Sequence, residues 1–251
     1  MECLQGLDKL FFELASESRL GILSELQVKE LRMQELAKRL GLTDTEVSRQ
    51  LQRLNDALLV QKQANGTYRM TAYAQLVLDI MSPLGVISKN REYFLEHDTS
   101  LLPFEFRARL GDLTNVKLTT STVDTMNEVA EMFEGAQNKI DASVLGVKHL
   151  LEITLRRLHE GVKVRWLVQE SFLNDARTMF RPGDIHPEIR STPRIIGNVN
   201  VTDKVAMLTL RRHDGAMSYN SFYGGEASFM KWAEDLFTHE WEKAKPWYPY
   251  T

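Results

Sequence analysis

Cysteine is nearly absent from this 251-residue chain, which contains only Cys3. A lone cysteine cannot form an internal disulfide, so the composition fits a reducing compartment and predicts a cytoplasmic protein. No apolar run reaches the ~18 residues that suggest a membrane-spanning helix. The first residues also lack a basic region followed by an apolar core. We therefore expect no membrane partner and no signal peptide.

Several motifs of enzymes and metal sites are missing as well. The chain has no Walker A sequence and no Gly-x-Gly-x-x-Gly. None of its six histidines is followed two positions later by lysine, the His-x-Lys pair of phospholipase-D-type phosphodiesterases. It has no His-Glu-x-x-His and no paired-cysteine spacing that would hold a metal. The sequence therefore predicts no cofactor, no metal site and no catalytic residue.

Net charge is small, but it is unevenly distributed. The formal net charge of -3 argues against a protein that coats nucleic acid along its whole surface. Between positions 28 and 71, however, eight basic residues stand against five acidic ones, a local balance of +3. The basic residues are Lys29, Arg32, Lys38, Arg39, Arg49, Arg53, Lys62 and Arg69. This excess favours contact between that stretch and a polyanion.

The stretch from 33 to 71 predicts a helix, a tight turn, a second helix and a β-hairpin. Gly41 stands where a helix end tolerates a left-handed residue, and Thr43 with Glu46 three positions later has the spacing of a capping box. Asn65-Gly66 predicts a two-residue hairpin turn in which both residues take positive φ. The apolar stripes of the two helices are Met33, Leu36, Ala37 and Leu40, then Val47, Leu51, Leu54 and Leu58.

The second helix carries polar side chains opposite its apolar stripe. Arginine can bind guanine edges or phosphates, glutamine can pair with adenine, and hydroxyls can bind phosphates. Such a helix suits the major groove, and a basic hairpin beside it suits the sugar-phosphate backbone. We expect DNA contacts from Thr43, Thr45, Ser48, Arg49, Gln50, Gln52 and Arg53 of the helix and from Lys62, Asn65 and Arg69 of the hairpin.

These motifs carry a resemblance to a known family. Glu35-Leu36-Ala37, the run from Val47 to Leu54, the basic hairpin and the upstream run from Leu14 to Leu26 resemble the winged helix-turn-helix of ArsR-like bacterial and archaeal regulators. The resemblance implies a DNA-binding transcription regulator with an operator duplex as partner. The chain departs from the family in having no Cys-x-Cys metal sensor at 31–36. It also has leucine at Leu58-Leu59-Val60, where the family often has glycine before the wing.

A helical segment is predicted from about 72 to 97, divided or kinked near Pro83 and Gly85. In such regulators the helix after the wing often forms a homodimer, and two reading heads one DNA turn apart would multiply specificity. The alternative is that its apolar stripe packs only on its own chain. The stripe consists of Tyr73, Leu76, Val77, Ile80, Leu84, Ile87 and Phe94. Residues 98–114 have the composition of a connection between two halves.

The second half alternates between strand-like and helix-like stretches. Strands are expected at 116–120, 140–147 and 162–168, with helices at 123–137, 149–159 and 171–180, the last capped by Ser171. This alternation implies parallel pairing with right-handed crossovers. A loop or lid is expected at 181–193, and strands at 195–201, 205–210 and 219–223. The final helix, about 227–245, should bury Phe229, Trp232, Ala233, Leu236, Phe237 and Trp241.

The second half also carries a resemblance, on the run from Leu155 to Arg165 and on the run from Phe229 to Phe237 with Trp241. These residues resemble the C-terminal sensor domain of methanogen winged-helix regulators, the family typed on a filament-formation regulator and related to regulators of methyltransferase genes. The layout is also similar to a phospholipase-D-like sheet. Ligands favour strand C-terminal ends, here 146–149 and 169–171. The candidates for lining a pocket are His149, Arg165, Trp166, Tyr219 and Tyr223.

The sequence thus predicts a mixed α+β or α/β chain with three parts. They are a winged helix-turn-helix DNA-binding domain at 1–72, a helical linker and dimerisation segment at 73–112, and an α/β sensor domain at 113–251. The predicted function is a dimeric, ligand-sensing transcription regulator whose operator affinity responds to an unknown small-molecule or protein effector. One alternative is an enzyme with an unrecognised active site in the second half. Another is a structural DNA-binding protein without ligand control.

Overall fold

The computed structural model describes residues 6–144, 148–181, 183–216 and 218–250. The chain divides into two compact units, Met1–Met81 and Ser82–Thr251. The predicted linker at 73–112 is not a separate part. Its first residues belong to the first unit, and from position 82 onward it contributes Val86, Tyr93 and Phe106 to the core of the second unit.

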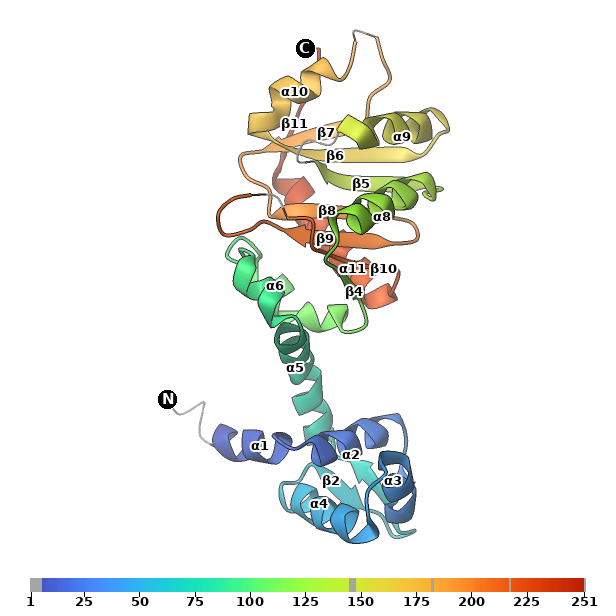
Figure 1. Ribbon diagram of the computed structural model, residues 1–251, viewed down its shortest axis with the longest axis vertical. Helices are drawn as coiled ribbons and strands as arrows, with labels where there is room; N and C mark the ends of the chain where they lie inside the picture. The colour runs from blue at the N-terminus through green and yellow to red at the C-terminus, as the bar shows by residue number, and fades with distance from the viewer. Residues whose placement is uncertain (1–5, 145–147, 182, 217, 251) are drawn as a thin grey trace. The chain divides into compact units, whose positions relative to one another are not determined.

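The first unit consists of helices and a small antiparallel sheet (Figure 1). Its helices are α1 (Leu7–Leu14), α2 (Glu17–Val28), α3 (Met33–Leu40) and α4 (Asp44–Asp56). Strands β2 (Val60–Lys62) and β3 (Thr67–Met70) form the hairpin, and β1 (Leu31–Arg32) pairs with β3. Two residues are too few to give an alternating pattern, which is why the sequence did not predict β1.

Side-chain hydrogen bonds and a glycine mark the ends of these helices, but only half of the predicted capping box forms, since the Glu46 carboxylate accepts the Ser18 hydroxyl at 3.2 Å instead. The hydroxyl of Ser16 accepts the backbone N–H of Arg19 at the start of α2, and that of Thr43 accepts the N–H of Glu46 at 3.2 Å at the start of α4. Gly41 ends α3 with a φ of 65°. The helices bury one stripe each in a core that includes Ile22, Leu23, Leu36, Val47, Leu51 and Leu54.

The hairpin turn differs from the prediction. Gly66 has a φ of 82°, but Asn65 does not have a positive φ. The N–H of Gly66 donates to the carbonyl of Gln63 at 3.0 Å, and the N–H of Gln63 donates to that of Thr67 at 2.7 Å. These bonds form a three-residue loop, a type I turn followed by a left-handed glycine, so only one position needs positive φ.

The second unit contains one mixed sheet among its described residues, in the order β11-β7-β6-β5-β8-β9-β10-β4. Strands β5, β6 and β7 are parallel, and every other pairing is antiparallel. The strands are β4 (Lys117–Thr119), β5 (Lys139–Val144), β6 (Lys163–Gln169), β7 (Glu188–Thr192), β8 (Gly197–Thr202), β9 (Ala206–Leu210), β10 (Ser221–Gly224) and β11 (Lys245–Pro246).

Two strand predictions require correction. The first expected strand, now β4, does not pair with β5 but lies at the far edge, antiparallel to β10. The segment expected to be a loop, 181–193, contains β7, which pairs in parallel with β6. Pro187 directly precedes β7. The loop that this proline predicts therefore ends where the strand begins.

Helices cover both faces of this sheet (Figure 1). α8 (Thr122–Glu134) and α9 (Lys148–His159) pack on one face, and α11 (Ala227–Lys243) packs on the other. All six residues predicted to point inward from α11 are buried, with exposures from 0% to 5%. Ser171 does not cap a helix: it lies inside the 3-10 turn Glu170–Phe172, and α10 (Leu173–Thr178) follows with no side-chain cap.

The segment after the hairpin forms α5 (Ala72–Lys89), which continues through Pro83, and then α6 (Arg91–Glu96). The predicted division near Pro83 therefore does not occur, and the break comes at Asn90 instead. α7 (Phe104–Ala108) and the 3-10 helix Leu110–Leu113 complete the second unit. No helix among the described residues is long and apolar enough to cross a membrane.

Candidate nucleic-acid interface

α4 presents one buried and one exposed face. Val47, Leu51 and Leu54 are 0%, 1% and 0% exposed in the core of the first unit. On the other side, Thr45, Ser48, Arg49 and Gln52 are exposed, as is the capping residue Thr43. The side chain of Gln52 is already oriented, because its amide donates to Asp56 at 2.7 Å. The exposed face offers hydroxyl, guanidinium and amide groups in one row, the chemistry that can bind base edges and phosphates.

Gln50 is a correction to the predicted set. It is only 7% exposed, and its side-chain carbonyl accepts a buried hydrogen bond from Arg19 at 3.0 Å. Position 50 follows the exposed Arg49 by about 100° of helix rotation, which turns its side chain toward α2. Gln50 therefore stabilises the packing of α4 and is not on the exposed face.

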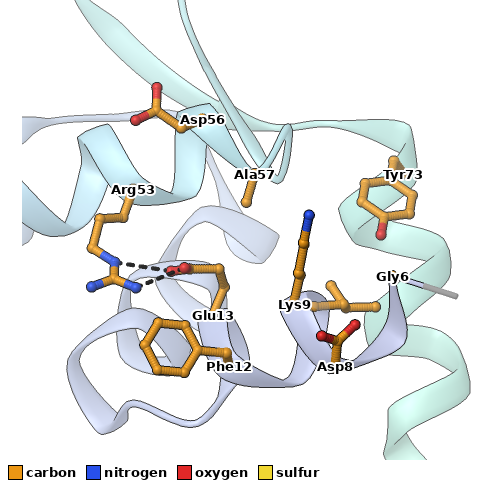
Figure 2. A pocket seen from close by; sticks show the side chains of 10 residues that line it. Gly6, Asp8, Lys9, Phe12, Glu13, Arg53, Asp56, Ala57 and Tyr73 are labelled. Carbon is orange, nitrogen blue, oxygen red and sulfur yellow. Dashed lines mark hydrogen bonds and ion pairs between the residues drawn. The ribbon is translucent and has the colours of Figure 1, made fainter.

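Arg53 is also bound within the chain. Its guanidinium donates to both carboxylate oxygens of Glu13, at 2.7 Å and 3.0 Å, and lies 5.1 Å from the centroid of the Phe12 ring. Figure 2 shows this pair with the ring beneath it. Arg53 keeps 38% of its side chain exposed, so it borders the exposed face while its charge is neutralised by α1.

Glu13 and Arg53 each shift the pKa of the other toward the charged form. The hydrogen bond from Arg53 holds the pKa of Glu13 below its ordinary value, and the attraction of Arg19 acts in the same direction. The same bond raises the pKa of Arg53. Glu13 is therefore an anion, and Arg53 a cation, throughout the neutral range.

The hairpin beside α4 exposes the predicted cations. Lys62 and Arg69 are exposed on the paired strands β2 and β3, and Arg69 donates to the side chain of Gln61 at 3.3 Å. The ammonium of Lys62 lies 5.9 Å from the Tyr68 ring centroid. Asn65 has a structural use in addition, because its side-chain oxygen accepts the backbone N–H of Thr67 at 3.0 Å.

A pocket of about 680 Å³ lies in the first unit, next to the Glu13–Arg53 pair. Figure 2 shows the Lys9 side chain extending into it from α1. α1, the end of α4 and the start of α5 supply its lining: Gly6, Asp8, Lys9, Leu10, Phe12, Glu13, Arg53, Asp56, Ala57 and Tyr73. No local pattern in the sequence predicts this pocket, because its lining residues, from positions 6 to 73, meet only in the folded chain.

The ligand candidates of the second unit do not converge. Arg165 and Trp166 are adjacent in β6, so their side chains point to opposite faces of the sheet. Arg165 donates twice to Asp141 at 2.7 Å, and its guanidinium lies 5.2 Å from each of the Phe237 and Trp241 rings of α11. Trp166 is 4% exposed on the α8 and α9 side.

The remaining three candidates are no closer to one site. Tyr219 is 39% exposed outside the sheet, where its carbonyl accepts the hydroxyl of Thr125. Tyr223 is half-buried on β10, and the side chain of His149 is outside the described part of the structure. The pocket beside Arg165, about 390 Å³, adjoins the first residues of β5 and β6. Of the expected ligand positions after β5, residues 146 and 147 lie outside the described part of the structure. The four candidates whose side chains are described thus occupy separate places.

Among the described residues, no group of three or more histidine, cysteine, aspartate or glutamate side chains could hold a metal ion. Two histidines of the second unit make local bonds: His97 Nδ1 lies 2.6 Å from the carbonyl of Tyr93, and His159 Nδ1 lies 2.7 Å from that of Leu155.

Comparison with known proteins adds to this geometry. A family model described as the HVO_A0261 N-terminal domain matches residues 7–91. The first part of the chain matches a known family. That match spans all of α1 to α5, including every residue of the candidate interface.

A curated relative matches over a longer stretch. The chain is 25% identical over 252 residues to the methanogenesis regulatory protein FilR1 of Methanothrix harundinacea (strain 6Ac). The match covers 92% of this chain and 56% of that protein, so the chain spans little more than half the length of this relative.

Solved structures give weaker likenesses. TrmBL2, titled an archaeal chromatin protein with a novel mode of DNA binding, is 17% identical with a TM-score of 0.44, covering 90% of this chain and 92% of that one. NucT from Helicobacter pylori is 9% identical with a TM-score of 0.41, covering 53% of this chain and 98% of that one.

Proposed function

We propose that this chain is a sequence-specific, DNA-binding transcription regulator. The observation that carries the proposal is the arrangement of α4, which buries Val47, Leu51 and Leu54 and leaves Ser48, Arg49 and their neighbours exposed beside a basic hairpin. In this proposal α4 enters the major groove of an operator, and Lys62 and Arg69 of the hairpin contact flanking phosphates.

The exposed groups divide into two roles. Arg49 can bind the O6 and N7 atoms of guanine, and Gln52 can bind adenine, so these two carry sequence reading. Thr43, Thr45 and Ser48 sit in the first turns of α4 and bind phosphate oxygens with their hydroxyls. The side-chain oxygen of Asn65 stabilises the hairpin loop by accepting the Thr67 N–H. The exposed side-chain NH₂ of Asn65 can then donate to the DNA sugar-phosphate backbone.

The comparisons support the regulator class. FilR1 is named a regulatory protein of methanogenesis, and its likeness extends over both units of this chain. The family match coincides with the unit that carries the proposed reading helix. An archaeal origin, of the kind that the FilR1 likeness suggests, and a winged helix-turn-helix of the ArsR-like kind are parts of the same proposal.

The regulator is proposed to act as a homodimer through α5. Tyr73, Leu76 and Ile80 of this helix are 45%, 62% and 75% exposed, and Leu84 and Ile87 follow at 50% and 38%. Their separations of three and four residues place them along one stripe. A helix that buries one apolar face in its own chain and exposes a second is stabilised when the second face packs against another copy, because that contact removes apolar surface from water.

The second unit is proposed to sense a small-molecule or protein effector and to have no catalytic role. A ligand that binds one arrangement of the dimer better than another would change operator affinity by that difference in binding free energy. The mixed sheet with helices on both faces is a framework that could hold such a site.

The deciding experiment has two steps. Mapping of the DNA bound by the tagged protein across the genome of its source would give operator fragments. Binding to one fragment is then measured for the wild type, for Arg49→Ala and for the matched variant Arg177→Ala, which removes the same charge from an exposed position on α10 of the second unit. We expect Arg49→Ala to weaken binding by about 1–3 kcal/mol and Arg177→Ala to leave it unchanged. Equal affinities for all three proteins would contradict the proposal.

A further inference from the structure

A cation of the proposed reading helix is held by the chain itself. Arg53 follows Arg49 by four residues, a rotation of only about 40°, so the two side chains leave α4 from neighbouring positions. Arg49 is exposed, whereas Arg53 donates from Nε and from one Nη atom to the two carboxylate oxygens of Glu13 in α1, at 3.0 Å and 2.7 Å.

Glu13 is fixed between two arginines. One of its oxygens lies 3.4 Å from the Nε atom of the buried Arg19. Arg19 in turn donates to the carbonyl of Phe12 at 2.8 Å and to Gln50 at 3.0 Å. The carboxylate is therefore aimed at Arg53 by a set of bonds that joins the end of α1 to α2 and α4.

Apart from these bonds, α1 makes few apolar contacts, and its Leu10 is only partly buried against the core of the first unit. The helix has eight residues, and Leu14 is the one buried residue among them. Phe11 and Phe12 are 45% and 64% exposed. A helix of this length is marginal without packing, so detachment of α1 is one of the least costly openings of the first unit.

We propose that α1 is an internal competitor of DNA, in which Glu13 occupies the Arg53 guanidinium that a phosphate of the operator would otherwise bind. Arginine presents the same pair of donors, Nε and one Nη, to a carboxylate and to a phosphate, so the two acceptors exclude each other at this bidentate position. Displacement of α1 frees Arg53 and adds one phosphate contact for each reading head. This inference rests on the proposed function of α4.

Glu13→Gln tests the competition, because glutamine retains the size of the side chain and loses its charge. We expect tighter binding to the operator fragment at low salt, and a slope of log affinity against log salt that steepens by about 0.9 for each reading head. Asp8→Asn is the matched control, since it removes one negative charge from an exposed position of the same helix. It should leave the slope unchanged.

Arg53→Ala completes the cycle. In the wild-type background this change should alter operator affinity little, because Arg53 is occupied. In the Glu13→Gln background it should remove the whole gain in affinity and in salt slope. Circular dichroism on every variant checks that the helices are retained, and Glu13→Asp, which shortens the reach by one methylene, should give an intermediate gain if Glu13→Gln does not fold.

The outcomes separate this inference from the proposed function. If Arg49→Ala weakens binding while folded Glu13→Gln binds like the wild type or more weakly, α1 is a structural brace and the competition is refuted. The competition is also refuted if Arg53→Ala lowers operator affinity as much in the wild-type background as in the Glu13→Gln background. If Arg49→Ala has no effect on binding, the proposed function itself fails.

Discussion

Leu58 takes a backbone conformation that suits glycine. Its φ of 60° makes it the one residue other than glycine with a positive φ in the described chain, and its side chain is 70% exposed. It directly follows α4 and Ala57 and turns the chain into β2. The left-handed conformation costs a residue with a Cβ roughly 1–2 kcal/mol. Leu58 therefore has the backbone geometry of a glycine although it carries a Cβ.

Leu58→Gly should stabilise the first unit. Relief of the strain is partly offset by the greater freedom of glycine in the unfolded chain, which leaves an expected gain of up to about 1 kcal/mol. Urea unfolding would measure it as a higher midpoint at constant slope. Leu58→Ala is the matched control: it removes the same exposed side chain but keeps the Cβ, so it should show no such gain. A midpoint for the glycine variant at or below that of alanine would refute the explanation.

At the level of single residues, the residue type and its position around the helix predict most of the side chains that α4 exposes. Thr45, Ser48, Arg49 and Gln52 are exposed as their place opposite the apolar stripe predicts. Gln50 and Arg53 could not be judged in this way. Their partners, Arg19 and Glu13, are 31 and 40 positions away, and no residue pattern within α4 predicts these contacts.

At the level of elements, α5 shows how far periodicity leads. Helical spacing predicted one apolar stripe, but the helix has two. Ala74 is buried in the core of the first unit, with Val77 and Leu78 packed against it, while Ile80 and its neighbours are exposed on another side. The pattern alone does not say which stripe meets the chain's own core and which remains for a partner.

Ile80→Glu tests the dimer that α5 is proposed to form. Because Ile80 is 75% exposed, a charge there should leave the fold of the chain intact but oppose the burial of that face against a second copy. Sedimentation should show the dimer for the wild type and a monomer, or a dissociation constant raised at least about tenfold, for the variant. Ser88→Glu adds the same charge to an exposed position about 80° around the helix and should remain dimeric. A wild type that sediments as a monomer would contradict the proposed dimer.

The elements of the second unit were recognisable from sequence, but their neighbours were not. The alternation of Val162, Val164, Trp166 and Val168 predicted β6, and the six apolar residues of α11 predicted its buried face. β7 was missed because Glu188, Arg190 and Ser191 lack the apolar, β-branched composition of a buried strand. β7 is a strand because β6 supplies a parallel partner on one side and β11 pairs with it on the other.

For the whole molecule, the titration of a few groups predicts how stability depends on pH. Burial lowers the pKa of His97 below its ordinary 6.5, with the hydrogen bond to the carbonyl of Tyr93 opposing the shift. A histidine whose folded pKa is lowered contributes stability that is complete above pH 6.5 and is lost as the pH falls below it. The charged and titratable groups that act on His97 are Glu96, Arg212 and His213.

Carboxylates add a second step at lower pH. The hydrogen bond from Arg53 lowers the pKa of Glu13 from 4.5, and the hydrogen bonds from Ser100 lower that of Asp98 from 3.8. Their stabilisation is present above those ordinary values and is lost as the pH falls through the lowered ones. We therefore expect the second unit to lose stability first, below pH 6.5, and both units to lose it further below about pH 4.

Calorimetry from pH 8 to pH 3 on the wild type and on His97→Gln would check both steps. The variant should lack the first decline, from about pH 6.5 downward, and keep the second. A variant that declines in parallel with the wild type between pH 7 and pH 5 would show that His97 is not the group responsible.

The sequence by itself determined the elements whose signals are local. The cap at Thr43, the glycine at position 41 and the apolar stripes place the reading helices of the first unit, since each signal acts within one or two turns of the chain. The tertiary structure decided the rest: the Glu13–Arg53 pair, the burial of Gln50, the far-edge position of β4 and the separation of Arg165 from Trp166. Each of these depends on which distant segments meet, and that is set by the free energy of packing the whole chain and not by any one stretch of it.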